Sequence, residues 1–135
     1  VYVSRVGDLR ISRSWIESNS AREGGGIHAS LLARLQVNDS WVSRNAAVES
    51  GGGLAVGGVD EALVANTSIR ANTARVGGGL RFDGAAIVAA TLVGLNVSDN
   101  RAQIRGAALA ADGSSMVEAD QIQFVANEVI EGSGT

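Results

Sequence analysis

Apolar and polar residues alternate along the chain with a period of two, which is typical of short β-strands and not of helices. Leu35 and Val37, for example, flank the polar Gln36. Similar alternations recur just before each of a series of asparagines and just after each of a series of glycine clusters. The pattern therefore predicts an all-β chain in which three short strands recur in a fixed order.

The alternation belongs to an internal repeat. An apolar-x-x-Asn pattern occurs five times, and successive asparagines lie 26, 27, 28 and 27 residues apart. Glycine triplets follow the first three asparagines, and weaker glycine clusters follow the other two. Five copies indicate a repeat architecture and not chance. The repeated asparagines are Asn19, Asn45, Asn72, Asn100 and Asn127, and the triplets are Gly24 to Gly26, Gly51 to Gly53 and Gly77 to Gly79.

Three short strands per repeat of about 27 residues, separated by Gly, Asn and Asp turns, describe one coil of a parallel β-helix. The sequence predicts a single right-handed parallel β-helix over 1–135, a solenoid of about five coils that forms part of a longer one. The right hand follows from the general preference for right-handed crossovers. A globular antiparallel β fold is the alternative, although the repeat spacing does not suggest its hairpins. The expected coils are approximately 1–26, 27–53, 54–79, 80–108 and 109–135.

The repeat position predicts where each side chain points. Glycine triplets are expected at corners where side chains would collide. The asparagines are expected at turns, because asparagine tolerates left-handed backbone, bonds neighbouring main chain and can stack into an amide ladder. The residues three positions before the asparagines are expected inside the coil, as are alternate residues of the other two strands. These inward positions include Ile16, Val42, Ile69, Val97 and Phe124, together with Val1, Val3, Val117 and Ala119.

Composition fits a narrow tube. Apolar residues make up 45% of the 135 residues but aromatic residues only 4%, as expected where ladders of Val, Ile, Leu and Ala fill the interior. The net charge is −3 and the cations form no run, which argues against a nucleic-acid partner. Cysteine is absent, so neither a disulfide scaffold nor a thiolate metal site is expected. We expect no cofactor and no membrane-spanning segment, because no apolar stretch approaches roughly 18 residues.

Two tryptophans are the candidate contact residues for a ligand or partner. Trp15 and Trp41 both stand four residues before their asparagines, so they should lie on the same outward face of adjacent coils. A flat aromatic pair suits a sugar ring or the apolar surface of a partner protein. Alternatively, another segment of the parent protein or an N-terminal cap covers the pair.

No catalytic residue is predicted. His28 is the only histidine and is expected outside, near Glu23 or Glu49, but nothing marks the activated serine that a triad requires. Several aspartates are expected in loops between the strand after the glycines and the next strand, where a turn is the simplest role. These aspartates are Asp8, Asp60, Asp83 and Asp112.

The glycine and asparagine motifs resemble a known family. Gly-Gly-Gly-Ile at 24–27, Gly-Gly-Gly-Leu at 51–54 and 77–80, and Phe-x-x-Asn at 124–127 are similar to the repeats of polymorphic outer-membrane proteins. Such motifs also occur in many bacterial right-handed parallel β-helix surface proteins. The resemblance covers essentially the whole chain and implies an exported protein, often an autotransporter passenger or an anchored surface protein, with a role in adhesion. It also implies an extracellular or bacterial cell-surface location.

These observations predict a structural, adhesive segment of a bacterial cell-surface or secreted protein, which presents a rigid face to a protein or glycan and is not an enzyme. Two alternatives stay open. The chain could be a fragment of a polysaccharide-active β-helix enzyme whose active site lies outside this window. It could also be a subunit that assembles end to end with like subunits through open coil faces.

Overall fold

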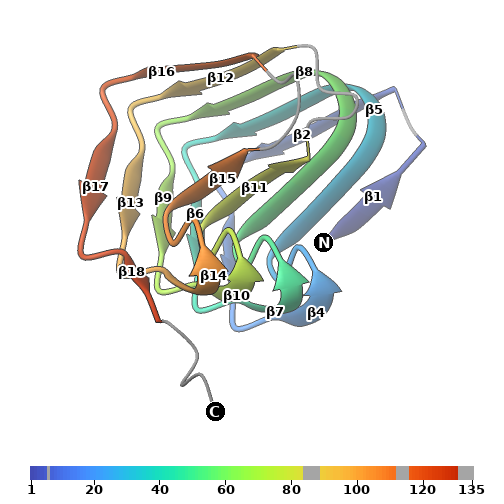
Figure 1. Ribbon diagram of the computed structural model, residues 1–135. Coiled ribbons are helices and arrows are strands. Elements are labelled where there is room, and N and C mark those ends of the chain that lie inside the picture. Colours follow the sequence, from blue (N-terminus) through green and yellow to red (C-terminus); the bar gives the residue numbers. More distant parts are fainter. Residues whose placement is uncertain (6, 84–88, 112–115, 131–135) are drawn as a thin grey trace.

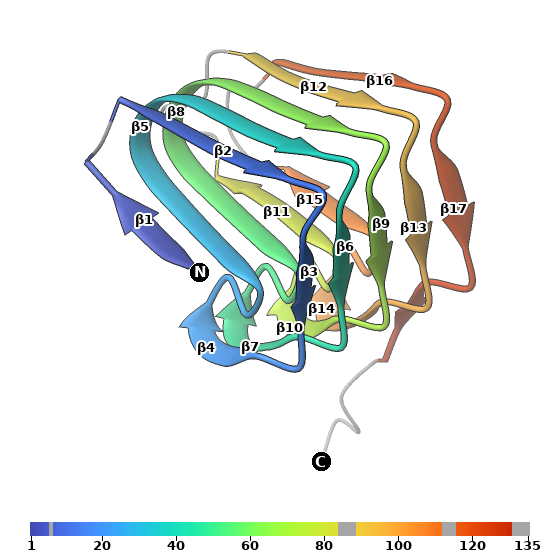
Figure 2. The ribbon, with the colours of Figure 1, turned by 180° about the vertical axis from the view of Figure 1, so that it is seen from behind.

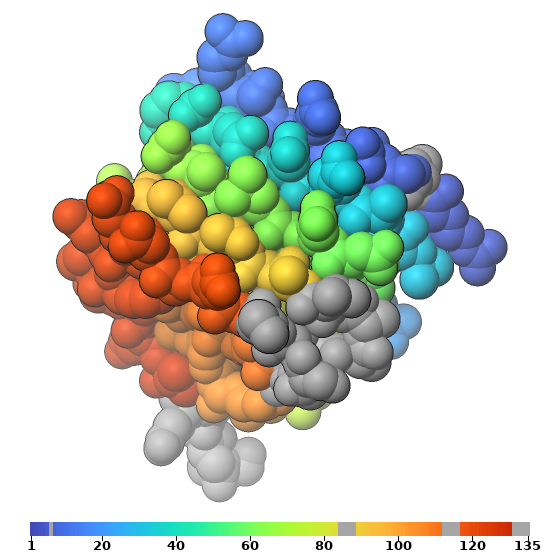
Figure 3. All heavy atoms as spheres, turned by 90° about the horizontal axis from the view of Figure 1, so that it is seen from above, coloured from blue at the N-terminus to red at the C-terminus, as the bar shows by residue number. Residues whose placement is uncertain are grey.

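The computed structural model describes residues 1–5, 7–83, 89–111 and 116–130. The regular elements of this part of the chain are all strands, and they pair in parallel as three sheets of a β-solenoid (Figure 1). Each sheet is crossed five times with a spacing of about 27 residues, so the chain completes about four turns. The predicted all-β solenoid is confirmed. Seen from above, the coils lie side by side in chain order (Figure 3).

Sheet A is the largest sheet and has two halves. One half has the order β1-β5-β8-β11-β15, and in the other half β2 pairs with β5, while β12 pairs with β8 and β16. The 12-residue strands β5 and β8 run through both halves and bend between them (Figure 2). The strands of sheet A are β1 (Tyr2–Ser4), β2 (Asp8–Ser12), β5 (Ile27–Asn38), β8 (Leu54–Ala65), β11 (Leu80–Asp83), β12 (Ala89–Val93), β15 (Leu109–Ala111) and β16 (Met116–Asp120).

Sheets B and C complete each turn. Sheet B has the order β17-β13-β9-β6-β3 and sheet C the order β18-β14-β10-β7-β4. The strands of sheet B are β3 (Trp15–Glu17), β6 (Trp41–Ser43), β9 (Ser68–Arg70), β13 (Asn96–Ser98) and β17 (Gln123–Val125). The strands of sheet C are β4 (Ser20–Glu23), β7 (Ala46–Ser50), β10 (Thr73–Val76), β14 (Arg101–Arg105) and β18 (Glu128–Val129).

The division of the coil into three separate strands was partly wrong. The strand after the glycines and the next strand belong to one sheet, and in β5 and β8 they are continuous. Leu31 and Gly58 turn the chain within these strands through positive φ values of 55° and 64° without ending the ladder. The sequence patterns also missed the strands of sheet C. Register shifts in that sheet disturb the period-two alternation on which strand prediction depends.

The core is a set of ladders that run from coil to coil. Val42, Ile69 and Val97 stack in register in sheet B and are fully buried, as the repeat predicts. Phe124 continues this ladder but is 52% exposed, because no described strand stacks on its far side. Val1, in the first coil, is also 52% exposed. Their predicted burial was therefore wrong, as it was for Ala119, which is exposed in β16 of the last described coil.

The glycine triplets form the corner between sheet C and sheet A. Gly24 has a positive φ of 60°, which glycine adopts without strain. At Gly25 an added Cβ would lie 2.5 Å from the Ala46 carbonyl oxygen and 2.6 Å from the Gly52 carbonyl oxygen. Main chain from the neighbouring coil therefore occupies the space that a side chain would need, as predicted from the sequence.

Candidate functional site

The repeated asparagines form a ladder of amides at the corner between sheets B and C. In the middle of this ladder, Asn72 Nδ2 donates to the Val42 carbonyl oxygen at 2.9 Å and to Asn100 Oδ1 at 3.0 Å. Asn72 Oδ1 accepts from the Asn45 backbone N–H at 2.9 Å and from Asn45 Nδ2 at 3.1 Å. The same pattern starts at Asn19 and ends at Asn127. Asn45, Asn72 and Asn100 therefore each bind main chain and the asparagine amide of the preceding coil, and the asparagine amide of the following coil.

The left-handed residue at this corner is not the asparagine itself. In each repeat the residue before the asparagine has a positive φ, for example Arg44 at 53° and Ala71 at 54°. The asparagine has an ordinary backbone and acts through its side chain. Asn45, Asn72 and Asn100 are buried. A buried, fully bonded amide has no free polar group for a ligand, so these three residues have a structural role.

The two tryptophans lie on the outer face of sheet B. Trp15 in β3 and Trp41 in β6 are in register, and their rings stack with centroids 4.7 Å apart and planes 20° apart. Trp15 is 68% exposed and Trp41 is 43% exposed. No described segment covers the pair. Two large apolar rings in water are unusual on a surface that otherwise carries mainly polar side chains.

A hollow adjoins this tryptophan pair. The residue in register with Trp41 in the next coil is Ser68, whose side chain is too short to cover the free face of the indole. A cavity of about 520 Å³ lies there and is lined by both tryptophans, Ser43, Ser68 and Arg70, among others. The hollow thus combines a flat aromatic wall with hydroxyl groups and a guanidinium.

Ion pairs join adjacent coils on the same outer surface. Arg44 Nη2 lies 2.6 Å from Glu17 Oε2, and Arg70 Nε lies 3.1 Å from Asp99 Oδ2. On sheet C, Arg22 donates to Glu49 at 2.8 Å, and this hydrogen bond raises the pKa of Arg22. These side chains are largely exposed, and such pairs contribute little to stability because water screens them. Arg44 and Arg70, paired with Glu17 and Asp99, line the hollow beside the tryptophans.

The acidic residues and His28 lie on different strands of the described solenoid. Asp8 begins β2 and Asp83 ends β11, while Asp60 lies inside β8 and not in the predicted loop. Asp112 lies outside the described residues. In the described part of the chain, no group of three or more His, Cys, Asp or Glu side chains is placed to hold a metal ion.

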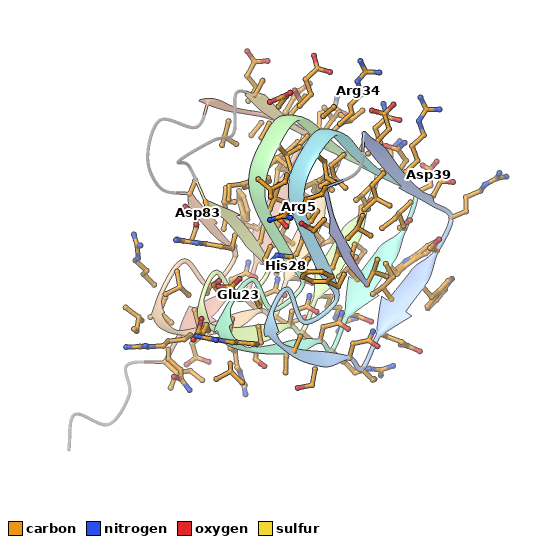
Figure 4. The ribbon with its side chains drawn as sticks, turned by 90° about the vertical axis from the view of Figure 1, so that its right-hand side faces the viewer. Arg5, Glu23, His28, Arg34, Asp39 and Asp83 are labelled. Carbon is orange, nitrogen blue, oxygen red and sulfur yellow. The ribbon has the colours of Figure 1, made fainter. Side chains whose placement is uncertain are left out.

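His28 lies near Glu23, as the sequence predicts, and near further residues that the sequence patterns did not bring together. Its Nδ1 lies 3.7 Å from Glu23 Oε2, and its ring stacks on Tyr2 with centroids 4.9 Å apart. Figure 4 shows Glu23, His28 and Asp83 on the same side of the solenoid. Arg81 lines the same cavity as these three residues. Arg81 and Asp83 join Glu23 and His28 only when the coils are aligned in register.

Among the described residues, no helix has the length and hydrophobicity needed to span a membrane. Comparisons of the chain with family models, with curated proteins and with solved structures gave no match.

Proposed function

We propose that this chain is a structural and adhesive β-solenoid segment of a bacterial cell-surface or secreted protein, and that Trp15 and Trp41 form its glycan-binding platform. The observation that carries the proposal is the exposed indole stack beside the hollow over Ser68. The solenoid holds both rings on strands of one sheet, so the platform is rigid before any ligand binds. The proposal assigns no catalytic residue.

The hollow suits a sugar more than a protein side chain. A pyranose ring has an apolar C–H face and a rim of hydroxyl groups, and so needs a flat aromatic surface flanked by hydrogen-bonding groups. The free face of Trp41 supplies the flat surface. Ser43, Ser68 and Arg70 line the same hollow and supply polar groups that orient a ligand. A sugar stacked on Trp41 would continue the ladder of rings that Trp15 begins.

Fluorescence provides a direct test, because Trp15 and Trp41 are the only tryptophans of the chain. We expect at least one short oligosaccharide of glucose, N-acetylglucosamine or galactose to change the emission saturably. Trp41→Ala should weaken binding by about 2 kcal/mol, or roughly 30-fold, as for a buried aromatic anchor. Binding to this variant is measured by calorimetry, with circular dichroism as the control for folding.

Two further variants sharpen this test. Ser68→Trp places a third ring where the sugar would stack and should abolish binding while it leaves the fold intact. Replacing both Trp15 and Trp41 by Ala should also abolish binding without a change in strand content. The proposal is wrong if none of the oligosaccharides binds, or if Ser68→Trp binds as tightly as the wild type.

The resemblance to polymorphic outer-membrane protein repeats supports the proposed location. That resemblance rests on the glycine triplets and on Phe124 and Asn127, and it favours an exported adhesin of the autotransporter type. Protease treatment of intact cells that produce the native protein tests the location. Cleavage of the protein on intact cells is the expected result, and protection until lysis would contradict it.

Self-association through the solenoid ends is a second candidate function. The last described coil exposes Phe124, Val125, Val129 and Ile130, which are apolar and lie on or next to strand edges. Exposed strand edges with apolar side chains promote pairing with further strands. Sedimentation velocity over a range of concentrations tests this candidate. Growth of larger species with concentration would support it, and a strictly monomeric species would contradict it.

A further inference from the structure

A column of outward side chains on sheet A changes abruptly in size. In-register pairing places Tyr2, His28, Ala55, Arg81 and Ala110 next to one another in successive coils. The first two rings stack, with centroids 4.9 Å apart and planes 23° apart. Arg81 has a planar guanidinium two coils further on. Between His28 and Arg81 the column holds only the methyl group of Ala55, which is 6% exposed.

A cavity lies at this position. It has a volume of about 400 Å³, within the range of pockets that bind small molecules. His28 and Arg81 line two of its sides, and Ala55 and Gly57 lie on the strand between them. His28 and Arg81 stand two strand spacings apart, about 9.6 Å along the solenoid axis. A planar ring above Ala55 would lie one strand spacing, about 4.8 Å, from each of the two strands that carry His28 and Arg81.

Two residues that line this cavity, Ala55 and Leu31, are held by close packing. A Cβ added to Gly51 would lie 2.6 Å from the Ala55 Cβ, so the Gly51 backbone lies against that methyl group. A Cβ added to Gly58 would lie 2.9 Å from Leu31 Cδ2, so Leu31 lies across Gly58. Leu31 holds a positive φ of 55°, an unfavourable backbone conformation for leucine. Gly58 makes the corresponding turn of the next coil with a φ of 64°.

We propose that this cavity binds a planar aromatic ring that bears N–H donors, and that the ring takes the place of the missing side chain between His28 and Arg81. The imidazole offers a stacking face on one side. The Arg81 guanidinium offers a cation–π contact on the other. The site lies on sheet A and is separate from the tryptophan platform on sheet B, so the proposal does not depend on glycan binding.

The charges around the cavity select the substituents of the ring. Glu23 and Asp83 contribute two carboxylates to the lining, and Arg81 contributes one guanidinium. Carboxylates and the hydroxyl groups of Ser30 and Ser50 accept hydrogen bonds from N–H groups. A neutral or cationic aromatic compound is therefore favoured over an anionic one. An indole that carries an amine has the required chemistry.

The test uses tryptamine, followed by the backbone amide NMR spectrum of the whole chain. We expect saturable shifts of the Ala55, Gly57 and His28 amides. Indole-3-acetate has the same ring and the opposite charge, and should bind up to about 5-fold more weakly. A capped Gly-Trp-Gly peptide identifies the source of the ring. Binding of tryptamine alone supports a free aromatic amine, and binding of the peptide as well supports an aromatic side chain of a partner.

Variants separate this site from the platform. Ala55→Trp fills the gap in the column with the chain's own ring and should abolish tryptamine binding without a change in oligosaccharide binding. Ser68→Trp is the matched control. It should abolish oligosaccharide binding without a change in tryptamine binding. If Ala55→Trp does not fold, His28→Ala replaces it, with an expected loss of affinity of about 2- to 12-fold from the removed stacking.

Three results would overturn the proposal. The first is the absence of saturable shifts with both tryptamine and the peptide. The second is shifts confined to the amides around Trp15 and Trp41. The third is an Ala55→Trp or His28→Ala variant that binds tryptamine as tightly as the wild type. Because each variant affects one sheet, a failure here is distinguishable from a failure of the glycan platform.

Discussion

Asn72→Ala tests the asparagine ladder at its centre. The Asn72 side chain is fully buried and makes four hydrogen bonds, two as donor and two as acceptor. Its partners are the Val42 carbonyl, the Asn100 amide, and the backbone and side-chain N–H groups of Asn45. Alanine removes all four bonds and leaves these groups without them in a buried corner. The hydrogen bond from the Asn72 backbone N–H to Asn100 Oδ1 does not need the side chain and persists.

The expected cost follows from this inventory. A hydrogen bond in a folded protein contributes about 1 kcal/mol net, so the four bonds together contribute about 4 kcal/mol. Unsatisfied buried donors raise this figure, because each costs about 1–3 kcal/mol in lost solvation. Domains of this size are stable by about 5–15 kcal/mol. The substitution should therefore remove a large part of the free energy of unfolding.

Urea denaturation followed by far-ultraviolet circular dichroism measures this effect. Asn19→Ala is the matched control, because Asn19 has the same repeat position but is exposed and donates only to the Glu17 carbonyl and to Asn45 Oδ1. We expect its free energy of unfolding to fall by about 1 kcal/mol or less. If Asn72→Ala costs no more than Asn19→Ala, the ladder does not hold the coils together and the reasoning is refuted.

Two further predictions concern the corners and the core. Gly25→Ala would place a Cβ 2.5 Å from the Ala46 carbonyl oxygen and should lower the free energy of unfolding by at least about 2 kcal/mol, whereas Gly7→Ala, with nothing within 4 Å, should change it by less than about 0.5 kcal/mol. Equal urea midpoints for the two variants would contradict the packing argument. Ile69→Ala, at a fully buried position, should lower the free energy of unfolding by about 2–5 kcal/mol. Phe124→Ala, at the same repeat position but half exposed, should lower it by only about 1 kcal/mol. Calorimetric melting curves check this order, and a larger loss for Phe124→Ala would show that the last coil is buried in solution.

Much of the fold is predictable from the sequence because a solenoid repeats one local rule. The distance from each asparagine identifies the buried ladder of Val42, Ile69 and Val97 and the outward face of Trp15 and Trp41. Parallel in-register stacking follows from the repeat itself, since equivalent residues of adjacent coils must then be neighbours. The exposure of Phe124 departs from this rule because the rule assumes a coil on both sides.

Other features depend on contacts between coils that a single repeat does not contain. Sheet C has shifted registers, so its strands lack a regular alternation. The turn at Leu31 lies within β5 and has no glycine to mark it, unlike Gly58 in the next coil. The cavity beside His28 brings together His28, Ala55 and Arg81, which lie on three successive coils. Such a site becomes visible when the coils are aligned in space.

The most direct test of the parallel solenoid is the set of backbone NOEs between residues one coil apart. In-register pairing predicts NOEs that connect Trp15 to Trp41, Trp41 to Ser68, Ser68 to Asn96 and Asn96 to Gln123. Each of these contacts joins residues about 27 positions apart in the sequence, on strands that run parallel to each other. NOEs that instead join neighbouring strands of one repeat in antiparallel pairs would contradict the solenoid and the two sites built on it.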